Sequence, residues 1–160
     1  MILSENQTKV LLAGIKSSRV SEVNGMSHVE GYDIRAMLIR VFGYGGWSEI
    51  AQLPTKLLYE QETTTRAGKA AYKVAYRASR RLVIDDCIYD GSAVGESIMP
   101  DFKRGDAHDM AIKTAETQAL KRCAINLGDQ FGLSLYRKGS TAPLVRKLAD
   151  GAEIAEVVEQ

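Results

Sequence analysis

Residues 70–84, AAYKVAYRASRRLVI, alternate in side-chain character along most of their length. A period of two is typical of a β-strand, because successive side chains point to opposite faces of a sheet. The apolar face comprises Tyr72, Val74, Tyr76, Ala78, Leu82 and Ile84, interrupted by Arg80, and the basic face comprises Lys69, Lys73, Arg77 and Arg81. The pattern therefore predicts a long strand, extending to Asp85, with one buried and one solvated face.

Turn signals on both sides of this strand predict an antiparallel sheet. RAGK at 66–69 is typical of a hairpin turn, and the alternation before it predicts a strand that starts at Trp47. Asp85 and Asp86 form a second turn signal, followed by a third strand from Cys87 to about Ser97. Three or four strands joined by short turns pair in antiparallel fashion.

Helical patterns precede the strands. Ser4 and Gln7 form a capping-box pattern ahead of an apolar period, which predicts a first helix near 4–16. A second helix is expected at 32–42, and it ends at GYGG, residues 43–46, a sharp turn into the first strand. Residues 20–26 between the two helices have the composition of a loop.

A long helix follows the strands, from about 107 to 127, with Asp106 as its expected N-cap. Its apolar arc comprises Ile112, Ala119, Leu120, Cys123 and Leu127. Glu116 falls inside this arc, so we expect it to pair with a nearby basic group. The predicted class is α+β, with an antiparallel three- to four-stranded sheet packed against a long helix and with N-terminal helices.

The chain has 160 residues, of which 45% are apolar, enough for the core of one ordinary domain. We expect a domain at 1–142 and an amphipathic helix with an acidic tail at 143–160, where Pro143 suits a first helical turn. Neither a membrane-length apolar run nor a secretory signal pattern occurs, which predicts a soluble, cytoplasmic protein. Cys87 and Cys123 are isolated and expected to be reduced.

The net charge of +1 conceals a strong asymmetry along the chain. Residues 149–160 carry four carboxylates and no basic group, so residues 1–148 hold 21 basic against 16 acidic groups. Residues 66–81 hold six basic groups and no carboxylate. This local charge favours an anionic partner. The alternative interpretation is a solvated strand face.

Signatures of catalysis are absent. The sequence has no phosphate-binding glycine loop with a Lys-Ser or Lys-Thr pair. Asp106, His108 and Asp109 resemble a cation site, but helix capping explains the aspartates, and their side chains leave the helix in different directions. His28 and Glu30 are interpreted as a surface pair. We therefore expect a protein that is not an enzyme and that uses no metal and no cofactor.

The basic strand face suits a nucleic acid backbone. Lys73, Arg77 and Arg81 recur every fourth residue, so neighbouring charges stand about 13 Å apart, near two nucleotide steps of an extended strand. Lys121 and Arg122 on the long helix offer further phosphate contacts. We interpret this set as able to follow a sugar-phosphate backbone, although many β-strands carry a basic solvent face.

Two blocks of sequence resemble the N-terminal domain of the Rad52 family of single-strand annealing proteins. The first is SSR at 17–19, HVEGY at 28–32 and VFGYGGWS at 41–48. The second is AIKTA at 111–115, QALKRCA at 118–124 and LGDQFG at 127–132. The match extends from about Ser17 to Tyr136, and the order and spacing of both blocks make it specific.

The resemblance implies a subunit that assembles into a ring or helical multimer with a positive groove for single-stranded DNA, as in phage or prokaryotic annealing proteins. It implies inner DNA contacts at Arg19, Lys121 and Arg122, with Lys113 on the same helix, and an outer site near Lys103 and Arg104. Ile125 stands where many members have another arginine. Expected partners are single-stranded DNA, further copies of the chain, and a recombinase or single-strand-binding protein. Localisation at the bacterial nucleoid follows from that role.

Two other functions suit the same order of elements. A double-stranded RNA-binding module also combines strands, helices and basic groups, although it is about half this size and has no use for the 43–47 turn. A non-catalytic interaction protein would use the basic strand only as a solvated face.

Overall fold

The computed structural model describes residues 3–148, which form two compact units interleaved along the sequence. Within the described range, one unit contains 49–83 and 88–123, and the other contains 3–48, 84–87 and 124–148. The expected boundary between residues 142 and 143 stays a prediction. None of the described helices is long and apolar enough to cross a membrane.

The first unit is built on a three-stranded sheet, which confirms the predicted antiparallel sheet. Its strands are β3 (Ser48–Thr64), β4 (Ala70–Ile84) and β5 (Cys87–Pro100), with β4 in the centre. The amide of Thr65 donates to the carbonyl of Lys69 across the first turn, and Asp85, with φ of 50°, begins the second. The apolar face of β4 is buried at Val74, Ala78, Leu82 and Ile84, as the alternation predicts. The opposite face is not solvated throughout, because its small residues Ala71, Ala75 and Ser79 are buried as well.

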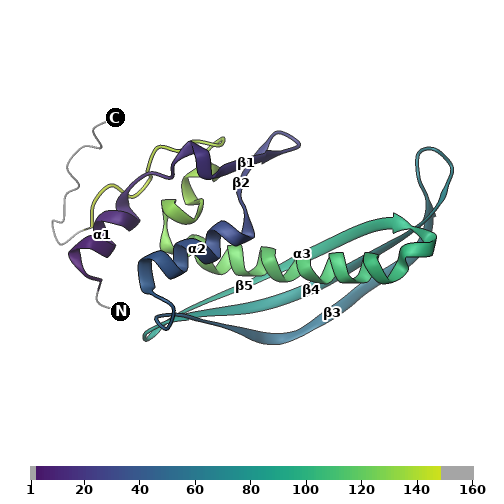
Figure 1. Ribbon diagram of the computed structural model, residues 1–160, viewed down its shortest axis with the longest axis horizontal. Helices are drawn as coiled ribbons and strands as arrows, with labels where there is room; N and C mark the ends of the chain where they lie inside the picture. Colours follow the sequence, from purple (N-terminus) through teal and green to yellow (C-terminus); the bar gives the residue numbers. More distant parts are fainter. Residues whose placement is uncertain (1–2, 149–160) are drawn as a thin grey trace. The chain divides into compact units, whose positions relative to one another are not determined.

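Helix α3 (Arg104–Ala124) lies along one face of this sheet, in green in Figure 1. It faces the sheet with small residues at every fourth position, the fully buried Ala107, Ala111, Ala115 and Ala119. The predicted arc is correct at Ala119, Leu120, Cys123 and Leu127, whereas Ile112 is only half-buried.

Glycines of β5 let the strand approach α3 closely. A Cβ added to Gly95 would stand 2.3 Å from the backbone oxygen of Ala111 and from the nitrogen of Ala115, and one on Gly91 would stand 2.6 Å from the oxygen of Ala119. The small side chains of these alanines and the absence of side chains at the two glycines therefore set the short distance between helix and sheet.

The expected N-cap of this helix is wrong. A 3-10 turn, η2 (Asp101–Lys103), runs directly into α3, and Arg104 already has helical angles, with φ of −59° and ψ of −39°. Asp106 therefore lies in the first turn and not before it. Its charge still favours the helix, because the N-terminus carries the positive end of the helix dipole.

Arg80, which interrupts the apolar face of β4, forms ion pairs with two carboxylates. Arg80 pairs with Glu116 on α3 at 2.5 Å and with Glu49 on β3 at 3.3 Å, which confirms the expected partner for Glu116. The Arg80 side chain is only 12% exposed, so these carboxylates compensate a charge that would be costly alone. Nearby, the thiol of Cys123 donates to the carbonyl of Arg80, and burial raises the pKa of this thiol to about 11. Cys87 and Cys123 are both free, as expected.

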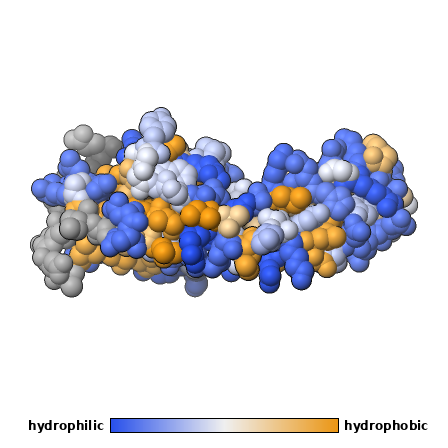
Figure 2. Space-filling model, turned by 90° about the horizontal axis from the view of Figure 1, so that it is seen from below, coloured by the Kyte–Doolittle hydropathy of each residue, from blue (hydrophilic) through white to orange (hydrophobic). Residues whose placement is uncertain are grey.

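Apolar side chains of β3 remain in contact with solvent. Ile50, Leu53, Leu57, Leu58 and Tyr59 are each 39–50% exposed. They lie on an edge strand of 17 residues, whose backbone groups on the outer side have no neighbouring strand in the described sheet. Figure 2 shows one face of the molecule, where apolar residues in orange reach the surface among hydrophilic residues in blue.

The second unit begins with α1 (Glu5–Leu12), and its capping box between Ser4 and Gln7 is confirmed. The helix ends four residues earlier than expected. Helix α2 (Gly31–Phe42) ends at Gly43, whose φ of 81° suits a glycine. The predicted loop between the helices is wrong, because β1 (Val20–Val23) and β2 (Met26–Val29) form an antiparallel hairpin. The signal was Asn24-Gly25, a pair that favours positive φ at both positions of a tight turn, here 52° and 75°.

After α3 the chain continues as three short 3-10 helices, η3 (Ile125–Leu127), η4 (Asp129–Phe131) and η5 (Leu133–Tyr136). Asp129 is fully buried, and its carboxylate accepts the amides of Leu144 and Val145 at 2.8 and 3.1 Å. Residues 144–148 are not helical, so the predicted helix does not begin in this segment. The rest of that segment lies outside the described residues.

Candidate nucleic-acid interface

The basic row of β4 is interrupted by carboxylates from the next strand. Lys73 pairs with Glu96 at 3.0 Å, and Arg81 pairs with Asp90 through two contacts of 2.7 and 2.8 Å. Arg77 is exposed and makes no ion pair within the described residues. The local excess of charge in residues 66–81 is therefore smaller in three dimensions than in the sequence.

These contacts change the pKa values of the carboxyl groups. The hydrogen bonds from Arg81 hold the pKa of Asp90 below its usual range. Hydrogen bonds from Tyr59 and Lys73 likewise lower the pKa of Glu96. Both carboxylates therefore remain charged at neutral pH and offset the two cations.

We expect Arg81→Gln to return the pKa of Asp90 to the ordinary aspartate value of about 3.9. Because the pKa of Asp90 is lowered in the folded protein, its ion pair with Arg81 stabilises the fold at pH values above the ordinary aspartate pKa. This stabilisation is lost as the pH falls through the folded-state pKa of Asp90. A carbon-detected NMR titration of the Asp90 carboxyl measures the shift. Lys113→Gln, which removes a charge on α3, serves as the control and should leave Asp90 depressed. An ordinary pKa for Asp90 in the unsubstituted protein would contradict the pairing.

The predicted residues of α3 and the turn before it differ in their surroundings. Lys113 pairs with Asp109 one turn away at 2.6 Å, with both side chains more than half exposed. Lys121 is half-buried and Arg122 is exposed in the last turn. Lys103 is exposed, whereas Arg104 pairs with Asp101 and Glu62 and lies 4.8 Å from the ring centre of Tyr72.

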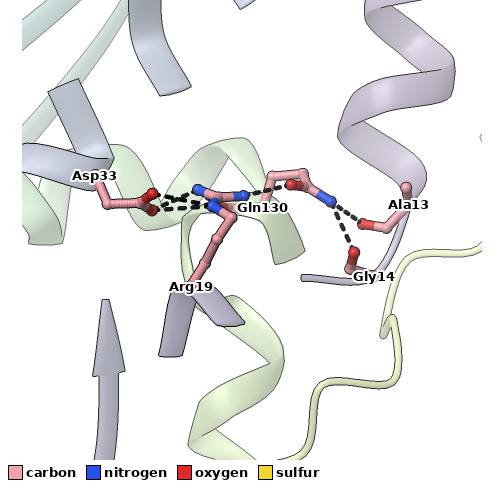
Figure 3. A network of polar contacts seen from close by, with 5 residues as sticks. All are labelled: Ala13, Gly14, Arg19, Asp33 and Gln130. Carbon is pink, nitrogen blue, oxygen red and sulfur yellow. Dashed lines mark hydrogen bonds and ion pairs between the residues drawn. The ribbon is translucent and has the colours of Figure 1, made fainter. Parts of the chain in front are cut away.

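Arg19 has a packing role that its serine-rich context did not indicate. Figure 3 shows its guanidinium between Asp33 of α2 and Gln130 of η4. Nη2 lies 2.6 Å from Asp33 Oδ2, and Nη1 lies 2.6 Å from Gln130 Oε1. Arg19 therefore helps to hold α2 and η4 together, while its contact with DNA stays a prediction.

Comparison with known protein families shows the family to which this chain belongs. A family model described as Rad52/22 family double-strand break repair protein matches residues 6–147. This chain belongs to the Rad52/22 family.

Relatives in the Rad52/22 family include three yeast proteins, each named DNA repair and recombination protein RAD52. The Candida glabrata protein is 30% identical over 126 residues, which is 78% of this chain, and the Kluyveromyces lactis protein is 26% identical over 144 residues, or 89%. The Saccharomyces cerevisiae protein is 26% identical over 132 residues, or 82% of the chain. The matches cover 22–30% of the length of these relatives, so the chain corresponds to part of them.

The region matched to the Rad52/22 family includes all nine predicted contacts: Arg19, Lys73, Arg77, Arg81, Lys103, Arg104, Lys113, Lys121 and Arg122. Sequence reasoning missed Asp33 and Gln130, which hold Arg19. Gln130 lies within the quoted LGDQFG segment, but nothing in its spacing relates it to residue 19.

The two histidines of this Rad52/22 chain occupy hydrogen-bonded positions. His28 lies 3.0 Å from Glu30, as predicted for a pair. The ring nitrogens of His108 lie 2.9 Å from the Tyr76 hydroxyl and 3.2 Å from the Tyr72 hydroxyl, so His108 faces the sheet and not Asp106 or Asp109. Among residues 3–148, no three His, Cys, Asp or Glu side chains are grouped as a metal site would need.

Proposed function

We propose that this chain binds single-stranded DNA and anneals complementary strands without ATP or metal, in DNA recombination and repair. The observation that carries the proposal is membership of the Rad52/22 family across residues 6–147. The yeast relatives named as repair and recombination proteins support the same biological process. In this role the chain associates with DNA and is not an enzyme.

The basic residues fit a binding mode that depends on phosphate. Arg77, Lys103 and Arg122 have exposed side chains able to reach a sugar-phosphate backbone. Fixed cations on phosphates reduce the repulsion between two strands and leave base edges available, and base pairing then drives annealing. The rate should depend little on sequence and should fall at high salt, because bound counterions oppose the phosphate contacts.

Self-assembly into a ring or helical multimer is part of the proposal. The exposed apolar residues of β3 support it, because a long edge strand with apolar side chains is a template for pairing with another chain. A repeated contact between two different surfaces generates rings or filaments. Mass measurement in solution tests this part, and a monomer at micromolar concentration, with and without DNA, would overturn it.

Annealing of fluorescent complementary oligonucleotides tests the function. We expect faster annealing than in protein-free solution, at rates unchanged by a chelator or by ATP and reduced by salt. Binding to single-stranded DNA, duplex DNA and duplex RNA at two salt concentrations distinguishes annealing from duplex RNA recognition. A rate equal to the protein-free rate would reject the proposed function.

A further inference from the structure

The contacts of Arg19 use almost all of its hydrogen-bonding capacity. Its Nε donates to both oxygens of Asp33 at 3.1 and 3.0 Å, and Nη2 donates to Asp33 Oδ2 at 2.6 Å. Nη2 also donates to the backbone oxygen of Gln130 at 3.0 Å, and Nη1 donates to Gln130 Oε1 at 2.6 Å. An arginine side chain has five N–H groups, so one N–H, on Nη1, has no acceptor among residues 3–148.

Gln130 is itself held in place, as Figure 3 shows. Its Nε2 donates to the carbonyl oxygens of Ala13 and Gly14, both at 2.8 Å. This orients Oε1 toward Arg19, because the amide nitrogen is committed to the two carbonyls. The guanidinium is thus fixed by a neutral, oriented partner on one side and a charged partner on the other.

Asp33 occupies the edge of the guanidinium that a phosphate would use. The Nε–Nη2 edge of arginine binds carboxylate and phosphate with the same two-pronged geometry. The side chains of Arg19 and Asp33 are only 16% and 20% exposed, so solvent screens their attraction less than that of a surface pair. A phosphate therefore has to displace the Asp33 carboxylate from this edge before it can form a two-pronged ion pair with Arg19.

We propose that Asp33 is an internal competitor for DNA phosphate, which keeps Arg19 neutralised in the assembled binding site and so lowers affinity for single-stranded DNA. Asp33 does not contact DNA itself in this proposal, and it acts by holding and neutralising the guanidinium of Arg19. The inference rests on the proposed function, since it concerns the contribution of one cation to DNA binding.

The main test is Asp33→Asn, which keeps the size of the side chain and one acceptor for Arg19 but removes the negative charge. Single-strand affinity is measured by fluorescence anisotropy with an oligothymidine at several salt concentrations. One released phosphate contact should steepen the slope of log affinity against log salt by about 0.7 and raise affinity about fivefold near 0.1 M salt. Glu5→Gln is the matched control, because it makes the same change in net charge at the exposed Glu5–Lys9 pair of α1. This control should leave the slope unchanged.

A double substitution, Arg19→Gln with Asp33→Asn, keeps the test decisive if the single variant folds poorly. It preserves net charge and leaves no uncompensated charge, and its slope should equal that of the unsubstituted protein. A shallower slope in the double variant would mean that Arg19 already binds phosphate, and it would overturn the inference. So would a slope for Asp33→Asn equal to that of Glu5→Gln, with thermal unfolding confirming a folded protein. Absence of single-strand binding by the unsubstituted protein would instead reject the proposed function itself.

Discussion

Gly95→Ala should destabilise the protein by about 3 kcal/mol, the upper part of the range for overpacked interiors. The added methyl would lie 2.3 Å from backbone atoms of both Ala111 and Ala115. Backbone atoms in the middle of a 21-residue helix cannot move aside as a flexible side chain would. The whole of α3 must therefore shift from the sheet, and the melting temperature should fall by about 6–12 °C.

Gly105→Ala is the matched control for this prediction. Gly105 lies in the first turn of the same helix, and a Cβ added there meets nothing within 4 Å. Alanine in a helix is favoured over glycine, so this variant should gain about 0.5 kcal/mol. Thermal or urea unfolding of both variants checks the pair of results. Equal stabilities would show that helix and sheet are not in close contact at Gly95.

The sheet could be predicted from sequence because its information is local. The alternation at residues 70–84 defined β4, and the turn residues on either side defined its neighbours. The β1–β2 hairpin was missed although its Asn24-Gly25 signal is equally local, since short polar strands around a turn resemble a loop in composition. Ala107, Ala111 and Ala115 on the buried face of α3 were missed for another reason. Alanine ranks low on an apolar scale, so the pattern did not mark these positions as buried. Their close packing depends on Gly91 and Gly95, which belong to β5 and not to the helix.

The electrostatics of the candidate site could not be predicted from sequence. Arg81 and Asp90 are nine residues apart, and they face each other only after the turn at Asp85 and Asp86. Arg19 bonds to Gln130, 111 residues away, so no local pattern relates the two. Resemblance to a family proposes which cations contact DNA, but it does not supply the carboxylates that neutralise them in this particular chain.

Simultaneous replacement of Lys121 and Arg122 by alanine should produce the largest loss of DNA binding. The two residues lie in the last turn of α3, at positions where the family resemblance implies inner DNA contacts. Each lost phosphate contact removes about 0.7 from the salt slope for a single strand, so two contacts remove about 1.4. Near 0.1 M salt this corresponds to roughly a 25-fold loss of affinity. Annealing should slow in parallel, because strands that are held weakly are rarely presented to each other.

The control for this pair is Lys9→Ala with Arg137→Ala, which removes the same charge from two exposed residues outside the proposed contacts. A change in slope shared by both double variants would indicate that net charge, and not position, determines binding. A change confined to Lys121 and Arg122, at unaltered melting temperature and subunit number, assigns the phosphate contacts to the end of α3. The slope is the decisive quantity, since a general loss of stability lowers affinity without removing released counterions.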